Sequence, residues 1–159
     1  NRPSVIILDT MNYWIENFWD SVKEVISKVD IISINDEESE MITGHKDLKK
    51  AAKGLNTMGP RYVIIKKGKD GAELFNYEKR YVASAYEVDK VIDPTGAGDC
   101  FIGGITGYLS QSSEVSFESI KSAIDYGTSL ASFNVENMAT KNLLNLSMSD
   151  IENRINKLK

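Results

Sequence analysis

Short apolar runs and amphipathic stretches alternate along the first half of the chain. The runs SVIILD (residues 4–9), DIISIN (30–35) and RYVIIKKG (61–68) are continuous and rich in β-branched residues, which is typical of strands buried on both faces. Between them, apolar residues recur at helical spacing over residues 12–28 and 46–58. Because strands alternate with helices of this length, we predict an α/β fold with a mostly parallel sheet flanked by helices.

The pattern changes after residue 70. The stretches GAELFN (71–76) and RYVASAYEV (80–88) flank the polar residues YEK and predict a hairpin, which adds antiparallel or edge strands to the sheet. Helical spacing then predicts three helices, over residues 98–111, 115–134 and 149–158. A capping box of Ser149 and Glu152 is expected to begin the last of them. Since no repeat or low-complexity linker interrupts the chain, we expect a single domain over residues 1–159.

Composition narrows the class of protein. With 159 residues, 42% hydrophobic and 26% charged, the chain has the make-up of an ordinary globular domain, which excludes disordered and collagen-like classes. A net charge of -4 without a basic stripe disfavours nucleic acid and membrane surfaces as partners. The single Cys100 cannot form an internal disulfide, which fits a cytoplasmic location, and one cysteine with one histidine cannot make a structural zinc site.

The stretch DPTGAGDCFIGG (residues 93–104) carries the candidate chemistry. Gly96 and Gly98 permit backbone conformations that other residues avoid, and the helix predicted to follow places unpaired N–H groups and a partial positive charge at the turn. Such a turn suits a phosphate or a developing oxyanion, and the Asp99 carboxylate beside it could accept a proton from a hydroxyl. The structural alternative is a tight turn in which Asp99 complements the helix dipole.

Two common phosphate-binding motifs do not account for this stretch. The chain contains no G-x-x-x-x-G-K-[ST] sequence, and Phe101 stands where G-x-G-x-x-G requires its third glycine. These departures disfavour P-loop enzymes and nucleotide-dependent oxidoreductases, so a different phosphate-binding design is required.

Residues 93–109 (DPTGAGDCFIGGITGYL) resemble the C-terminal signature of the ribokinase-like (PfkB) sugar and nucleoside kinases. Three further stretches agree with the family in order: DTMNYWIENFW at residues 9–19 resembles its D-x-N-x-x-x-W segment, NDEE at 35–38 its N-x-x-E motif, and KKGKDG at 66–71 its G-x-x-G nucleotide loop. The resemblance implies a three-layer ribokinase-like core and ATP-dependent phosphorylation of a sugar or nucleoside hydroxyl.

The resemblance also implies roles for individual residues. Asp99 would be the general base, and the backbone of Gly96, Ala97 and Gly98 would form the anion hole for the transferred phosphoryl group. The other implied contacts are Mg²⁺ held through water by Asn35 and Glu38, ATP beside Lys66, Gly68 and Gly71, adenine beside Asn134, and a monovalent cation such as K⁺ at Asp93. Without the family context, Asn35 and Glu38 also form a plain helix-capping box, and GKDG also fits a hairpin turn.

Members of the family are about twice as long as this chain, which resembles their C-terminal half. The chain begins at Asn1, and the family's N-terminal part and β-sheet lid have no counterpart in it. We therefore expect the complete protein to be a kinase and the isolated piece to be poorly active, with exposed apolar surface that favours a homodimer. The alternative is a non-catalytic nucleotide-binding or assembly domain of the same fold.

Overall fold

The computed structural model describes residues 2–158 and divides them into two compact units. The first unit runs up to Gly68 and includes Ala72–Val82, and the second comprises Lys69–Gly71 and the chain from Ala83 onward. This division does not test the prediction of a single domain over residues 1–159, which stays a prediction. Among the described residues no helix is both long and apolar enough to cross a membrane.

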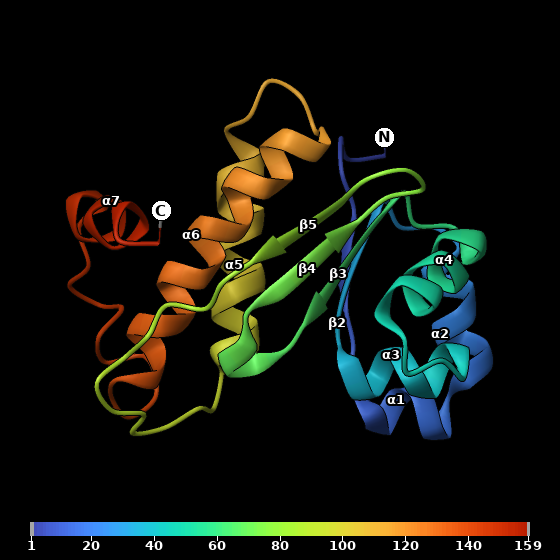
Figure 1. Ribbon diagram of the computed structural model, residues 1–159, viewed down its shortest axis with the longest axis horizontal. Coiled ribbons are helices and arrows are strands. Elements are labelled where there is room, and N and C mark those ends of the chain that lie inside the picture. The colour runs from blue at the N-terminus through green and yellow to red at the C-terminus, as the bar shows by residue number, and fades with distance from the viewer. Residues whose placement is uncertain (1, 159) are drawn as a thin grey trace. The chain divides into compact units, whose positions relative to one another are not determined.

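The sheet follows the order of the chain, β1-β2-β3-β4-β5 (Figure 1). Its strands are β1 (Ile7–Asp9), β2 (Ile31–Asn35), β3 (Tyr62–Lys66), β4 (Ala72–Phe75) and β5 (Arg80–Ala83). The first three pair in parallel, and β4 runs antiparallel to β3. The predicted α/β fold with a mostly parallel sheet is therefore confirmed. Strand β5 covers only the first four residues of the predicted stretch 80–88.

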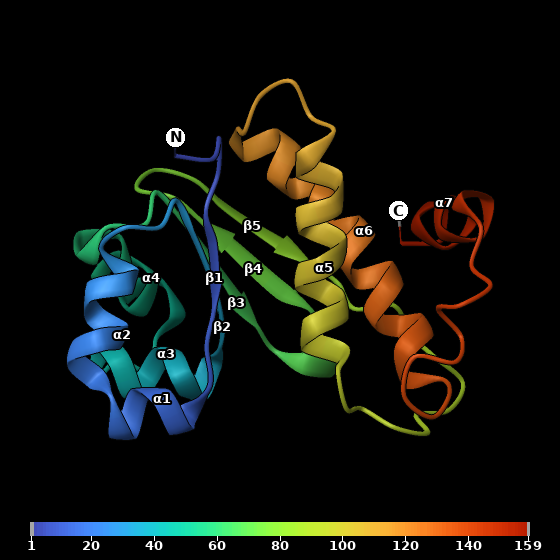
Figure 2. The ribbon, with the colours of Figure 1, turned by 180° about the vertical axis from the view of Figure 1, so that it is seen from behind.

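Four helices cover one face of the sheet in the first unit (Figures 1 and 2). They are α1 (Asn12–Asn17), α2 (Trp19–Ile26), α3 (Asp36–Thr43) and α4 (Leu48–Met58). Alternate strand residues point toward them, so Ile32 and Ile34 of β2 join Val63 and Ile65 of β3 in one apolar core. The other face of β2 carries Ser33 and Asn35, so the same strand serves both core and site.

The single helix predicted over residues 12–28 is wrong, because Phe18 breaks it into α1 and α2. Phe18 has φ −138° and ψ 40°, outside the helical region. Backbone hydrogen bonds between residues four apart nevertheless continue through the break: Phe18 N–H donates to Trp14 O, and Val22 N–H donates to Phe18 O. The break gathers the rings of Tyr13, Trp14 and Phe18 into one cluster, with centroids 5.1 to 6.0 Å apart. Apolar spacing persists across such a break and could not reveal it.

The second unit contains three helices, α5 (Ala97–Ser110), α6 (Phe117–Val135) and α7 (Met148–Asn156). The predictions for α5 and α6 are confirmed to within two residues. The capping box of α7 is formed by Ser147 and Asp150, not by Ser149 and Glu152. Both pairs have the same spacing. The helix begins at Met148, directly after Ser147, so Ser149 and Glu152 lie inside it.

Helices α5 and α6 lie side by side (Figure 2), and glycines of the two helices face each other where they approach closely. A Cβ atom on Gly127 would lie 2.5 Å from Phe101 O, and one on Gly104 would lie 2.8 Å from Gly127 Cα. Because both neighbours are backbone atoms, neither can move without shifting a helix. The contact therefore depends on residues without side chains.

We expect Gly127→Ala to lower the free energy of unfolding by about 1 to 3 kcal/mol, the usual cost of overpacking a core. Gly107→Ala is the matched control, because a Cβ at Gly107 meets nothing within 4 Å and alanine favours the helix by about 0.5 to 1 kcal/mol. Urea unfolding of both variants checks this. Equal stability of the two variants would mean that the helices are not held at this distance.

Candidate active site

The first three strands end in polar residues at one edge of the sheet. Asp9 closes β1, Asn35 closes β2 and Lys66 closes β3, and the register places Asn35 opposite Lys66. Ligands of open α/β sheets bind at this carboxyl edge. Lys66 Nζ lies 2.8 Å from both carboxylate oxygens of Asp9, and the two side chains are 19% and 22% exposed. The predicted nucleotide-site lysine is therefore held by an acid 57 residues away.

Asn35 and Glu38 form the helix-capping box that was one interpretation of their spacing. Asn35 Oδ1 accepts from Glu38 N at 2.7 Å, and Glu38 Oε2 accepts from Asn35 N at 2.9 Å. Glu38 is 4% exposed, and this burial raises the pKa of its carboxyl, against the hydrogen bond from Asn35 and the charge of Lys66. The structural role is confirmed, and it occupies only one carboxylate oxygen.

The oxygens of this box fit a hydrated divalent cation. Within residues 2–158, Glu38 Oε1 has no hydrogen-bond partner, and Asn35 Oδ1 keeps a second lone pair. Carboxylate and amide oxygens suit Mg²⁺, which retains several waters and needs few protein ligands. The box and a water-mediated metal contact are therefore compatible in the same two side chains.

The G-x-x-G segment forms a short 3-10 turn, η1 (Gly68–Asp70), between the antiparallel strands β3 and β4. Gly68 and Gly71 have φ of +56° and +85°, and a Cβ on Gly71 would lie 2.0 Å from Ala83 O. The hairpin interpretation of GKDG thus agrees with the structure. The backbone of the turn is open at Gly68, because nothing lies within 4 Å of the position that a Cβ atom would occupy there.

A buried carboxylate closes the base of this turn. Glu73, with a 5% exposed side chain, accepts from Lys67 Nζ at 3.0 Å and from Arg80 Nε at 2.7 Å. Burial alone would raise the pKa of Glu73, but the two ion pairs outweigh it and hold the pKa below its usual range. The Lys67–Glu73 ion pair therefore joins the two chain segments on either side of the turn, and we refer to this contact as the clamp.

We expect Glu73→Gln to lower the free energy of unfolding at pH 7 by about 1 to 3 kcal/mol, because it leaves two cations without their buried partner. The pKa of Glu73 is depressed, so its contribution is present above the usual carboxyl pKa and is lost as the pH falls through the folded value. Urea unfolding at pH 7 and pH 3 measures this. Glu78→Gln, in the exposed turn of the next hairpin, is the control, and equal stability of both variants would refute the clamp.

The first turn of α5 presents unpaired backbone donors beside a carboxylate. Gly96 is the N-cap residue with φ +80° and supplies no side-chain cap. Ala97 N–H donates to Pro94 O at 3.2 Å, whereas the N–H groups of Gly96, Gly98 and Asp99 have no hydrogen-bond partner in the described part of the chain. The Asp99 side chain is exposed. Two of the three residues predicted as anion hole thus offer free N–H groups, and Asp99 adds a third.

Asp93 and Asn134 brace this turn from either side. Asp93 Oδ1 accepts from Thr95 N at 3.0 Å and its Oδ2 accepts from Ala139 N at 3.4 Å, and these hydrogen bonds hold the pKa of Asp93 below its usual range. Asn134 Nδ2 donates to Thr95 O at 2.8 Å. Ala139 has φ +49°, the one positive value at a non-glycine residue between residues 2 and 158.

Each unit brings some of the predicted site residues together within itself. The first gathers Asn35, Glu38 and Lys66, and the second gathers Asp93, Asp99 and Asn134 with the glycine turn. Sequence reasoning did not single out Asp9 as a site residue. The available signal was an acid at the end of an apolar run, which is where parallel sheets place functional side chains.

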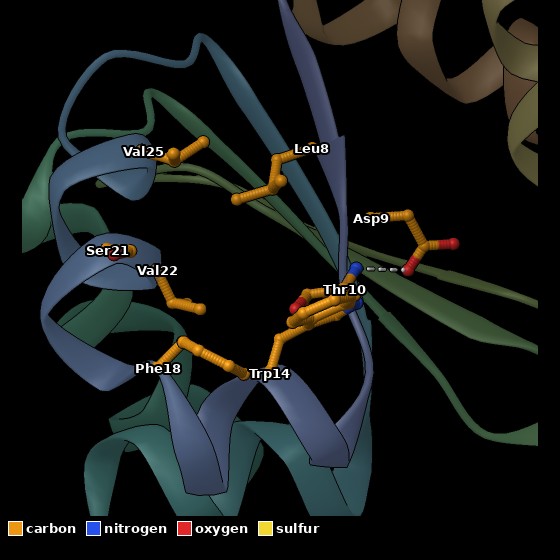
Figure 3. Close-up of a pocket in the computed structure, with 8 residues that line it drawn as sticks. All are labelled: Leu8, Asp9, Thr10, Trp14, Phe18, Ser21, Val22 and Val25. Atoms are coloured by element: carbon orange, nitrogen blue, oxygen red, sulfur yellow. Dashed lines mark hydrogen bonds between the residues drawn. The ribbon is translucent and has the colours of Figure 1, made fainter.

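A groove of about 400 Å³ beside β1 contains none of the predicted site residues (Figure 3). It is lined by Leu8, Asp9, Thr10, Trp14, Phe18, Ser21, Val22 and Val25. Figure 3 shows Leu8 facing the groove and the Asp9 carboxylate on the other side of the strand. The wall is largely apolar, so this groove and the polar edge that holds Lys66 are separate features of β1.

Comparison with known proteins bears on the family of the chain. The model of the pfkB family carbohydrate kinases matches residues 5–146. A cytidine kinase from Thermococcus kodakarensis is 37% identical over 91 residues, covering 56% of this chain and 33% of that protein. A ribokinase from Staphylococcus aureus is 32% identical over 118 residues, covering 71% of this chain and 37% of the relative. The chain thus spans about a third of these curated relatives.

A solved structure confirms the predicted ribokinase-like α/β fold. It is the aminoimidazole riboside kinase from Salmonella enterica, complexed with aminoimidazole riboside and an ATP analog. It superposes with a TM-score of 0.81 at 24% identity, over 95% of this chain and 52% of that one. At this identity the likeness shows the fold alone, while the family model covers most of the sequence. The chain therefore belongs to the pfkB family of carbohydrate kinases.

Proposed function

We propose that the protein carrying this chain is an ATP-dependent kinase that phosphorylates a hydroxyl of a sugar or nucleoside. One observation carries the proposal: the exposed carboxylate of Asp99 stands in the first turn of α5, beside the unpartnered N–H groups of Gly96 and Gly98. Phosphoryl transfer needs positioning and charge stabilisation more than covalent chemistry, and this turn offers both.

In the proposed reaction the acceptor hydroxyl attacks the γ-phosphorus of ATP. The bond from that phosphorus to the ADP oxygen breaks, the ester bond to the acceptor forms, and the hydroxyl proton passes to the Asp99 carboxylate. The free N–H groups and the dipole of the 14-residue helix α5 stabilise the negative charge on the equatorial phosphoryl oxygens. Product release returns the proton from Asp99 to solvent.

Strand β3 and the G-x-x-G turn after it supply the proposed nucleotide contacts. Lys66 lies near the phosphates, with Asp9 fixing its ammonium group in place, and the backbone at Gly68 and Gly71 lets ATP approach. Asn35 and Glu38 would hold Mg²⁺ through water, and the ion, when bound, offsets phosphate charge. The K⁺ contact of Asp93 and the adenine contact of Asn134 stay predictions.

Titration of the complete protein with Mg·ATP tests the proposal. We expect the backbone amide resonances of Gly68 and of residues 96–99 to shift, and phosphorylated acceptor to accumulate from a panel of sugars and nucleosides. Shifts without turnover on any acceptor would favour the non-catalytic nucleotide-binding domain. Resonances that do not move at millimolar Mg·ATP would contradict a nucleotide site at these residues.

A further inference from the structure

Asn134 is a buried amide with one unsatisfied hydrogen-bond acceptor. It lies in the last turn of α6 and is 1% exposed. Its Nδ2 donates to Thr95 O at 2.8 Å, while its Oδ1 is buried without a hydrogen-bond partner among the described residues. A buried acceptor without a partner is unfavourable, so an apolar residue would serve packing better at this position. What an apolar residue could not supply is the hydrogen bond to Thr95 O.

That bond determines the direction of a neighbouring donor. The carbonyl of Thr95 and the N–H of Gly96 belong to one planar trans peptide unit, in which they point in opposite directions. When Asn134 holds the carbonyl, the N–H of Gly96 points in the opposite direction, away from the Asn134 amide. Gly96 N–H is one of the three free donors at the start of α5.

Gly96 would not hold this orientation by itself. Its φ of +80° belongs to a region that glycine exchanges readily with others, so the peptide unit before it can rotate. A Cβ on Gly96 would lie 3.8 Å from Asn134 Nδ2 and 4.0 Å from its Oδ1, which places the amide directly behind the glycine. The Asn134 amide therefore lies directly beside Gly96, a residue whose backbone can change conformation easily.

Asn134 itself is firmly held. Arg154 of α7 donates to Ser132 Oγ at 3.0 Å and to Glu136 Oε2 at 2.9 Å, two residues before and two after Asn134. The guanidinium carbon of Arg154 also lies 3.4 Å from the centroid of the Phe133 ring. This ion pair and ring contact fix the end of α6, so the amide is a rigid support for the turn.

We propose that Asn134 is a positioning residue that fixes the Thr95–Gly96 peptide unit so that Gly96 N–H faces the transferred phosphoryl group. The inference rests on the proposed kinase function and assigns Asn134 a task other than the adenine contact that its place in the sequence implied. Asn134→Asp is the informative change, because it keeps the shape of the side chain, removes the donor to Thr95 and adds an acceptor that repels the carbonyl.

The orientation can be measured without substrate. Residual dipolar couplings of the complete protein report the direction of the Gly96 N–H bond, and we expect Asn134→Asp to change this direction while those of α5 and α6 stay as in the wild type. Asn134→Ser removes the same donor with a smaller side chain and serves if the aspartate variant does not fold. An unchanged Gly96 coupling in a folded variant would overturn the inference.

Kinetics separate positioning from binding. For Asn134→Asp we expect kcat to fall at least about 30-fold, as for loss of an anion-hole donor, with KM for ATP within about threefold of wild type. Asn142→Asp is the matched control, because Asn142 Nδ2 also donates to a backbone carbonyl, that of Phe133 at 3.2 Å, but not to a residue of the glycine turn. Its kcat should stay near wild type.

Three results would overturn the inference, and they differ from failure of the function itself. An unchanged kcat for Asn134→Asp, or an equal loss in Asn142→Asp, would reduce Asn134 to a structural residue in a working kinase. A raised KM for ATP with normal kcat would restore the adenine contact. A wild-type protein that phosphorylates no acceptor would remove the proposed function and, with it, the positioning role.

Discussion

Replacement of Asp99 by asparagine in the complete protein is expected to lower kcat at least about 100-fold, the usual worth of a general base, while KM for ATP stays within about threefold. The carboxylate is exposed in the first turn of α5, where it can reach a hydroxyl beside the free N–H groups. Asparagine keeps the size and polarity of the side chain but cannot accept the proton. Steady-state kinetics with saturating acceptor measure both parameters.

The control for this change is Asp20→Asn. Asp20 is also an exposed acid in the first turn of a helix, α2, and complements its dipole in the same way. Both substitutions should lower the free energy of unfolding by a similar few tenths to about 1 kcal/mol, and only Asp99→Asn should affect turnover. Near-normal turnover of Asp99→Asn would leave that residue with the dipole role alone.

Glu38→Gln should separate the capping role from the metal role of the same side chain. Glutamine can still accept from Asn35 N, so the capping box is kept, while the negative charge is lost. We expect the Mg²⁺ concentration for half-maximal velocity to rise about tenfold or more, as when an outer partner of a metal site is removed. Glu37→Gln, an exposed acid in the same turn, should leave it unchanged.

The stability of Glu38→Gln has a predicted pH dependence. Burial raises the pKa of Glu38 above its usual 4.5, so its favourable contribution to wild-type stability is complete below that value and is lost as the pH rises through the folded pKa. The glutamine variant has no such loss. Its free energy of unfolding relative to wild type should therefore increase from pH 4.5 upward and then level off, whereas a constant difference would contradict the burial of a charge.

The sequence was most informative where the signal is local. Continuous apolar runs located the strands, and the spacing of Asn35 and Glu38 predicted a capping box that the structure contains. Contacts that depend on strand register or on helix packing were out of reach. Lys66 meets Asp9 across 57 residues and Asn134 meets Thr95 across 39, and no periodicity links such pairs.

The turn of residues 93–104 shows the same limit within one motif. Glycine spacing predicted a helix N-terminus with free N–H groups, and α5 begins there. The pattern could not show that Ala97 N–H donates to Pro94 O, because that bond depends on the dihedral angles that the turn adopts. Which donors are free is a property of the folded backbone.

The decisive assay is transfer of labelled phosphate from γ-labelled ATP to a panel of sugars and nucleosides, with wild type and Asp99→Asn run in parallel in the presence of Mg²⁺. We expect a labelled phosphate ester of at least one acceptor with wild type, and at least about 100-fold less of it with Asp99→Asn. Equal labelling by the two proteins would refute the role of Asp99 as general base, and no labelled acceptor with wild type would refute the kinase activity.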